Sequence, residues 1–98
     1  MWGRDMTEDR IRELAVLFAL RHTPAVALER LDRHPGRIVS RGELQEALEA
    51  ATGSGWSMIS VATPVKFARR GIAGRGVITT RYSMGYQLHW IGPRPALP

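Results

Sequence analysis

Residues 60–90 read SVATPVKFARRGIAGRGVITTRYSMGYQLHW, and this stretch decides the fold. Its first part predicts a helix over residues 60–72, because apolar side chains recur there at the spacing of one helical face. These side chains are Val61, Val65, Ala68 and Ile72. Proline is tolerated only in the first turn of a helix, so Pro64 favours a start near Thr63.

The rest of the stretch predicts a β-hairpin directly after this helix. Glycines at positions 71, 74 and 76 interrupt the helical pattern, and residues 77–82 are then rich in β-branched side chains. Residues 83–85 (Ser-Met-Gly) have the composition of a turn. Residues 86–90 alternate between apolar and polar side chains, which is typical of a return strand.

Three more helices are expected upstream. An amphipathic helix covers residues 7–21, with Thr7 as a favourable N-cap. A second helix starts at Thr23-Pro24, where the threonine caps and the proline occupies the first turn, and it ends at residues 34–36.

The third helix opens at Ser40, which has capping-box spacing to Glu43. It ends at the glycine-rich residues 53–55, and residues 37–39 form a short extended stretch before it.

This order predicts a mainly α, α+β winged helix-turn-helix fold. It would comprise an extra N-terminal helix, a three-helix core and a C-terminal β-hairpin wing. The chain divides accordingly into an N-terminal amphipathic helix (1–22), a winged-helix DNA-binding domain (23–91) and a flexible proline-rich tail (92–98).

Charge is distributed unevenly along the chain. Residues 1–50 carry eight arginines and nine acidic side chains, whereas residues 51–98 carry five arginines and Lys66 with no acidic side chain. A basic half without carboxylates favours binding to a polyanion, because each nearby carboxylate would repel phosphate.

Composition argues against several other classes of function. The chain has no cysteine, and His22, His34 and His89 lack the spacing of metal ligands. The glycine-rich run at 71–76 follows a helix, whereas nucleotide-binding loops precede one. We therefore expect no enzyme activity and no cofactor. The longest apolar run, residues 14–20, is too short to span a membrane, which favours a cytoplasmic, nucleoid-associated protein. Thirteen of the fourteen cations are arginine, which is typical of a GC-rich bacterial or phage genome.

Two stretches carry a resemblance to a known family. The first begins at Thr23-Pro24 and continues through residues 34–44, which read HPGRIVSRGEL. The second covers residues 61–72, which read VATPVKFARRGI, and ends in residues 78–88, which read ITTRYSMGYQL. Both resemble the winged-helix DNA-binding domain of response regulators of the OmpR/PhoB type, and the similarity extends over about residues 20–90. The resemblance implies a transcription regulator, here a stand-alone domain without a receiver domain.

The chain departs from the family pattern in the helix expected to enter DNA. Ala62, Ala68 and Gly71 replace the usual Asp, Leu and Lys, and Pro64 and Phe67 stand where the family often has polar residues. The helix over 7–21 also replaces the family's N-terminal sheet. The family's preference for a DNA sequence therefore does not carry over.

Candidate contacts to double-stranded DNA lie on the helix over 60–72, on the hairpin and at the start of the third helix. Lys66 and Arg70 suit guanine or phosphate, and Thr63 and Phe67 suit a thymine methyl group. Flanking candidates are Arg41, Arg69, Arg75, Arg81 and Tyr82. For Arg41, a phosphate contact and an ion pair with Glu43, Glu46 or another acid of the first half are equally expected.

The alternative function is a winged-helix adaptor that binds a protein such as RNA polymerase and has little DNA affinity. Trp56, in the loop before the fourth helix, suits such a contact or a place in the core, and Ile59 is expected in the core. A homodimer through helix 7–21 is a further alternative, with contacts from Leu14, Leu17 and Phe18. RNA binding, which usually needs exposed aromatic platforms, is less favoured.

Overall fold

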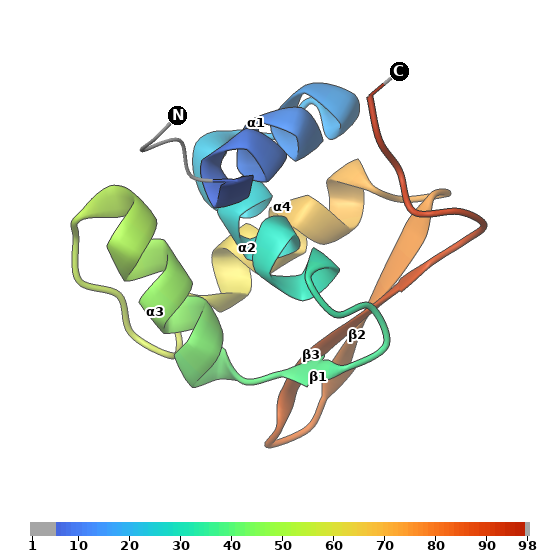
Figure 1. The fold of residues 1–98 in the computed structure, drawn as a ribbon. Helices are drawn as coiled ribbons and strands as arrows, with labels where there is room; N and C mark the ends of the chain where they lie inside the picture. The colour runs from blue at the N-terminus through green and yellow to red at the C-terminus, as the bar shows by residue number, and fades with distance from the viewer. Residues whose placement is uncertain (1–5, 98) are drawn as a thin grey trace.

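Helix α2 lies in the middle of the computed structural model, which describes residues 6–97 (Figure 1). It packs against the three other helices and against one strand of a sheet. The helices are α1 (Met6–Phe18), α2 (His22–Asp32), α3 (Arg41–Thr52) and α4 (Ala62–Gly71), and the strands are β1 (Ile38–Val39), β2 (Gly76–Arg81) and β3 (Gly85–Trp90). Within residues 6–97 the protein is thus a small α+β domain.

The three strands form an antiparallel sheet in the order β1-β3-β2. The hairpin was predicted, and β2 and β3 pair along their length, with Ile78 opposite Leu88. The extended stretch at residues 37–39 has a further role, because Val39 of β1 pairs with Tyr86 of β3. The hairpin is therefore attached to the connection between α2 and α3 as well as to α4.

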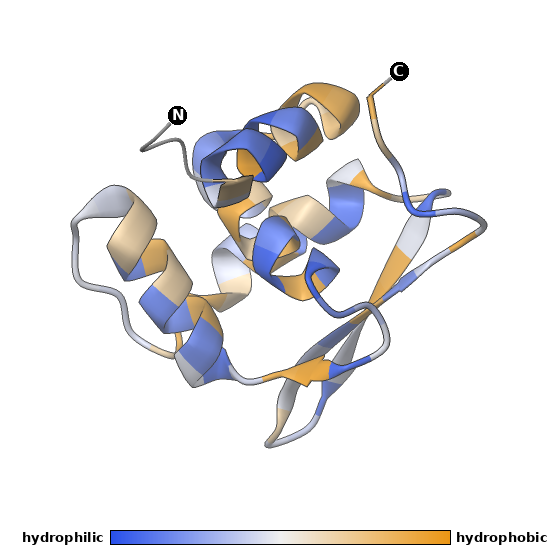
Figure 2. Ribbon diagram, viewed as in Figure 1, coloured by the Kyte–Doolittle hydropathy of each residue, from blue (hydrophilic) through white to orange (hydrophobic). Residues whose placement is uncertain are grey.

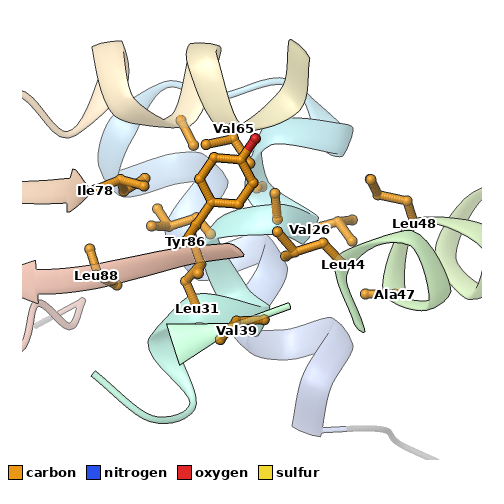
Figure 3. Close-up of a cluster of buried hydrophobic side chains, with 14 of the residues drawn as sticks. Val26, Leu31, Val39, Leu44, Ala47, Leu48, Val65, Ile78, Tyr86 and Leu88 are labelled. Atoms are coloured by element: carbon orange, nitrogen blue, oxygen red, sulfur yellow. The ribbon is translucent and has the colours of Figure 1, made fainter. Parts of the chain in front are cut away.

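One apolar core joins the helices to the sheet. In Figure 3 the Tyr86 ring of β3 stands at the centre, with Val65 of α4 above it and Leu31 of α2 below it. The helices have the alternating hydrophilic and hydrophobic colouring of amphipathic helices, as Figure 2 shows. None of the helices in residues 6–97 is long and apolar enough to cross a membrane.

Helix α3 begins and ends as predicted. The Ser40 side chain accepts a hydrogen bond from the Glu43 backbone N–H at 3.1 Å, and Gly53 closes the helix in the left-handed region. The Glu43 carboxylate contacts two arginines, Arg37 at 3.2 Å and Arg30 at 3.8 Å.

The turn between α1 and α2 differs from the prediction. Helix α1 ends at Phe18 instead of residue 21, because Ala19 adopts a left-handed conformation (φ 51°). Helix α2 then starts at His22, with Arg21 as its N-cap and no side-chain cap. The prediction that Thr23 caps α2 is wrong: Thr23 lies within the first turn, where Pro24 is still tolerated.

The predicted division of the chain extends partly beyond the described residues. Residues 1–5 of the segment 1–22 and residue 98 of the tail lie outside them. Within them, Ile11 and Leu14 of α1 belong to the same core as α2. The tail, expected to be loose, contacts the domain through Arg94 and through the Pro95 carbonyl, which accepts a hydrogen bond from Arg10 at 2.8 Å.

Buried Asp32 at the end of α2 connects three distant parts of the chain. Its carboxylate accepts hydrogen bonds from Arg10 of α1 (2.8 Å), the Trp90 indole N–H of β3 (2.9 Å) and Arg94 of the tail (2.6 Å). Burial by itself raises the pKa of Asp32, but the hydrogen bonds from Arg94, Arg10 and Trp90 together outweigh it and lower that pKa below 3.8.

This cluster predicts a specific loss of stability in acid. Because the folded-state pKa of Asp32 lies below its unfolded value, its contribution is present above about pH 4 and is lost as the pH falls through the folded pKa. Asp32→Asn should cost about 3 kcal/mol at pH 7 and should weaken the acid dependence. Urea unfolding of both proteins from pH 7 to pH 2.5 measures this, and parallel curves for the two proteins would contradict it.

A close backbone contact at Gly85 gives a second prediction. Gly85 has φ +137°, and a Cβ atom there would overlap the Val39 carbonyl of β1. Gly85→Ala should therefore cost about 3 kcal/mol. Gly53→Ala is the matched control, because Gly53 also has positive φ but has open space around it, and it should cost about 1 kcal/mol. Equal losses in urea unfolding would show that the contact with β1 is unimportant.

Candidate nucleic-acid interface

Helix α4 has the buried and exposed faces that its sequence spacing predicts. Its core-facing side chains, together with the flanking Val61 and Ile72, are buried, and the opposite side chains are exposed. The buried residues are Val61, Pro64, Val65, Ala68 and Ile72, and the exposed ones include Thr63, Lys66, Phe67, Arg69 and Arg70. The first turn of α4 contains Pro64, as expected from its lack of a backbone N–H.

The exposed face of α4 consists of three rows. Thr63, Phe67 and Gly71 line a hollow beside the α1–α2 turn. Lys66 and Arg70, one helical turn apart, run along the middle. Arg69 lies on the other edge and reaches the hairpin.

Lys66 and Arg70 are the cations best placed to meet a polyanion. Within residues 6–97, neither forms an ion pair with a carboxylate. The Arg70 guanidinium lies 5.8 Å from the centre of the Phe67 ring. Phe67 is 47% exposed, so this arginine and this ring form one exposed surface.

Arg69 has a role that its sequence position does not reveal. Its Nε donates to the Ile78 carbonyl of β2 at 2.9 Å, and its Nη2 donates to the Thr80 hydroxyl at 2.9 Å. The guanidinium therefore holds the hairpin at a set position relative to α4. Its remaining donors leave a DNA contact open, as the sequence predicts, but its main contacts lie within the domain.

The hairpin tip projects away from the helices (Figure 1). Tyr82 is 90% exposed, and Arg81 donates from Nε to Gln87 Oε1 at 2.8 Å. Met84, which sequence reasoning did not single out, is also exposed at the tip. Ser83 between them adopts a left-handed conformation (φ 63°), which closes the turn.

The structure separates Arg75 from the other candidates. Arg75 precedes β2, at the opposite end of the strand from Arg81, so one strand length of about 20 Å lies between them. Its guanidinium lies 5.7 Å from the centre of the Phe18 ring of α1, and Phe18 also stacks on Trp90. Arg75 is exposed but belongs to a different part of the surface from the hairpin tip.

Arg41 is the first residue of α3 and is half-buried. Two outcomes were equally expected for it, a phosphate contact and an ion pair. Within the described part of the chain, Arg41 makes no ion pair with a carboxylate, and the Glu43 carboxylate contacts Arg37 and Arg30 instead. A phosphate contact by Arg41 stays a prediction.

The loop between α3 and α4 corrects one prediction. Trp56 packs partly buried against the core, and its indole N–H donates to the Thr52 hydroxyl at 3.0 Å. Ile59, expected in the core, is instead 88% exposed next to exposed Met58. The hydroxyl oxygens of Ser57 and Ser60 each accept a hydrogen bond from the other residue's backbone N–H at 3.0 Å, so Ile59 lies in a hydrogen-bonded turn at the surface.

The proposed dimer contacts on α1 are only partly accessible. Leu14 is fully buried in the core, so it cannot contact a second chain in this fold. Leu17 is half-buried, and Phe18 is half-buried and stacked on Trp90. The large apolar side chains that α1 does expose are Met6 and Val16. The dimer stays a prediction.

The acidic side chains are confined to one part of the described structure. The acidic side chains of the described residues lie on α1, α2 and α3, and none lies on α4 or the sheet. The same residues contain no cluster of three histidine, cysteine, aspartate or glutamate side chains that could hold a metal ion.

Comparison with models of known protein families gives no match, and no curated protein matches this chain in sequence.

The contacts of Arg69 generate a stability prediction. Arg69→Ala removes two hydrogen bonds between α4 and β2 and should cost about 1–2 kcal/mol. Lys66→Ala, the matched control on the same helix, should change stability by less than about 0.5 kcal/mol. Thermal and urea unfolding measure both variants, and an unaffected Arg69→Ala would mean that the link to the hairpin does not stabilise the fold.

Proposed function

We propose that this protein is a winged-helix transcription regulator that binds double-stranded DNA. In this proposal α4 enters the major groove, and the β2–β3 hairpin acts as the wing beside it. The observation that carries the proposal is the exposed face of α4, where Lys66 and Arg70 lie beside Thr63 and Phe67 and form no ion pair with a carboxylate of residues 6–97. A cytoplasmic, nucleoid-associated protein would follow from this function.

The arrangement of elements supports the proposal. Two helices, α3 and α4, are joined by the loop of residues 53–61, and a hairpin follows the second. In helix-turn-helix proteins the second helix of such a pair reads the major groove. Arg69 holds the hairpin against α4, so a helix placed in the groove would bring the exposed tip residues Arg81 and Tyr82 to the DNA at the same time.

Electrostatics support the same surface. Within the described residues, no carboxylate lies on α4 or the hairpin to repel phosphate. A DNA-binding surface needs exposed, unpaired cations, because affinity comes largely from release of counterions by phosphate contacts. Lys66 and Arg70 meet this condition, whereas Arg10, Arg33 and Arg94 are paired with carboxylates.

The second candidate function is an adaptor that binds a protein, such as RNA polymerase. The observation that favours it is the loop tip before α4, where Met58 is 56% and Ile59 is 88% exposed. Adjacent exposed apolar side chains are common in surfaces that bind proteins. The two functions use different surfaces, so variants separate them.

Fluorescence anisotropy with a 25-base-pair duplex over a salt series tests the DNA proposal. We expect the logarithm of the binding constant to fall with the logarithm of salt concentration with a slope of about −4. Lys66→Ala and Arg70→Ala should each make this slope shallower by about 0.9, because each removes one phosphate contact.

Arg12→Ala is the charge-matched control, since Arg12 is exposed on α1, away from α4. It should leave the slope close to the wild-type value. A folded wild-type protein that does not bind the duplex at low salt would overturn the DNA proposal. In that case, binding of RNA polymerase that is lost in Ile59→Asp would support the adaptor.

A further inference from the structure

A groove separates α4 from the turn between α1 and α2. It encloses about 570 Å³. Phe18, Leu20 and Arg21 contribute to one wall, and Thr63 and Phe67 of α4 contribute to the other. Leu20 lies directly over Gly71, where an added Cβ atom would force the Leu20 side chain to move. The groove therefore continues the exposed face of α4 toward α1.

The chemistry of the groove suits a chain that alternates apolar and anionic groups. Its lining combines aromatic and aliphatic side chains with the hydroxyl groups of Thr23 and Thr63, and none of the lining residues is acidic. Arg21 is exposed at the wall and forms no ion pair within residues 6–97. A sugar–phosphate backbone has this alternation, with deoxyribose rings between charged phosphates.

Geometry places such a backbone on this side of α4. The major groove is about 12 Å wide, and a helix with its side chains is about 10–12 Å across. A helix in the major groove of DNA therefore lies close to both DNA strands at once. The edge of α4 that carries Arg69 faces the hairpin and the DNA strand beside it. The edge that carries Phe67 would therefore face the other DNA strand.

We propose that the groove between α4 and the α1–α2 turn receives the backbone of one DNA strand, with Arg21 as a phosphate contact. This inference rests on the proposed function and deepens it. It extends the DNA interface to a segment that sequence reasoning did not include, and it gives the α1–α2 turn a binding role besides its packing on Gly71.

The first test compares Arg21→Ala with Arg12→Ala in the same anisotropy salt series. Both variants remove one exposed arginine near α1. Arg21→Ala should weaken binding about 3- to 10-fold near 0.15 M salt and make the salt slope shallower by about 0.9. Arg12→Ala should leave the slope unchanged.

The second test adds a carboxylate to the groove without harming the fold. Thr23→Glu places an acidic side chain in the first turn of α2, where a negative charge stabilises the helix. It should weaken DNA binding at least 10-fold. Met6→Glu is the control, because it adds the same charge to the start of α1, away from the groove, and it should have a much smaller effect.

The outcomes distinguish DNA binding in the groove from DNA binding by the protein as a whole. If the wild-type protein binds the duplex while Arg21→Ala matches Arg12→Ala and Thr23→Glu matches Met6→Glu, the groove inference is overturned and the proposed function stands. If the folded wild-type protein binds no duplex, both are overturned. If Arg21→Ala and Thr23→Glu weaken DNA binding while Arg12→Ala and Met6→Glu do not, the result supports a DNA strand in the groove.

Discussion

Val65 and Ala68 of α4, and Ile72 directly after it, pack into the core with almost no exposure, and this burial determines which side of α4 faces outward. Because the apolar row covers one face of the helix, the cations on the opposite face must lie on the surface. Tyr86 of β3 packs against the same row, so the burial that orients α4 also positions the sheet (Figure 3). The candidate DNA-binding surface is in this sense a consequence of core packing.

The extra helix α1 is integrated into this arrangement. Phe18 stacks on Trp90 at the end of the sheet, and Leu20 occupies the space over Gly71 that a longer side chain would fill. Asp32 then joins α1, β3 and the tail through hydrogen bonds from Arg10, Trp90 and Arg94. Gly71 therefore has a packing role, because its small size lets the α1–α2 turn lie against α4.

Local signals in the sequence predicted the parts of the structure that depend on neighbouring residues. The Ser40 cap and the apolar spacing of α4 are examples, since each needs only residues within one or two turns. The failures depend on distant contacts or on the path of the chain. Thr23 does not cap α2 because Ala19 ends α1 early, and Ile59 is exposed while Trp56 of the same loop packs against the core. Arg69 contacts β2, a partner that no local pattern reveals.

The central claim is that α4 and the hairpin tip form one surface for double-stranded DNA. The most direct measurement is to follow the backbone amide signals of the 98-residue chain by NMR during titration with a short duplex. We expect the largest changes at Thr63, Lys66, Arg70 and Tyr82, and none at the Met58–Ile59 loop tip. Changes confined to that loop tip or to α1, or no change on α4 at low salt, would contradict the account.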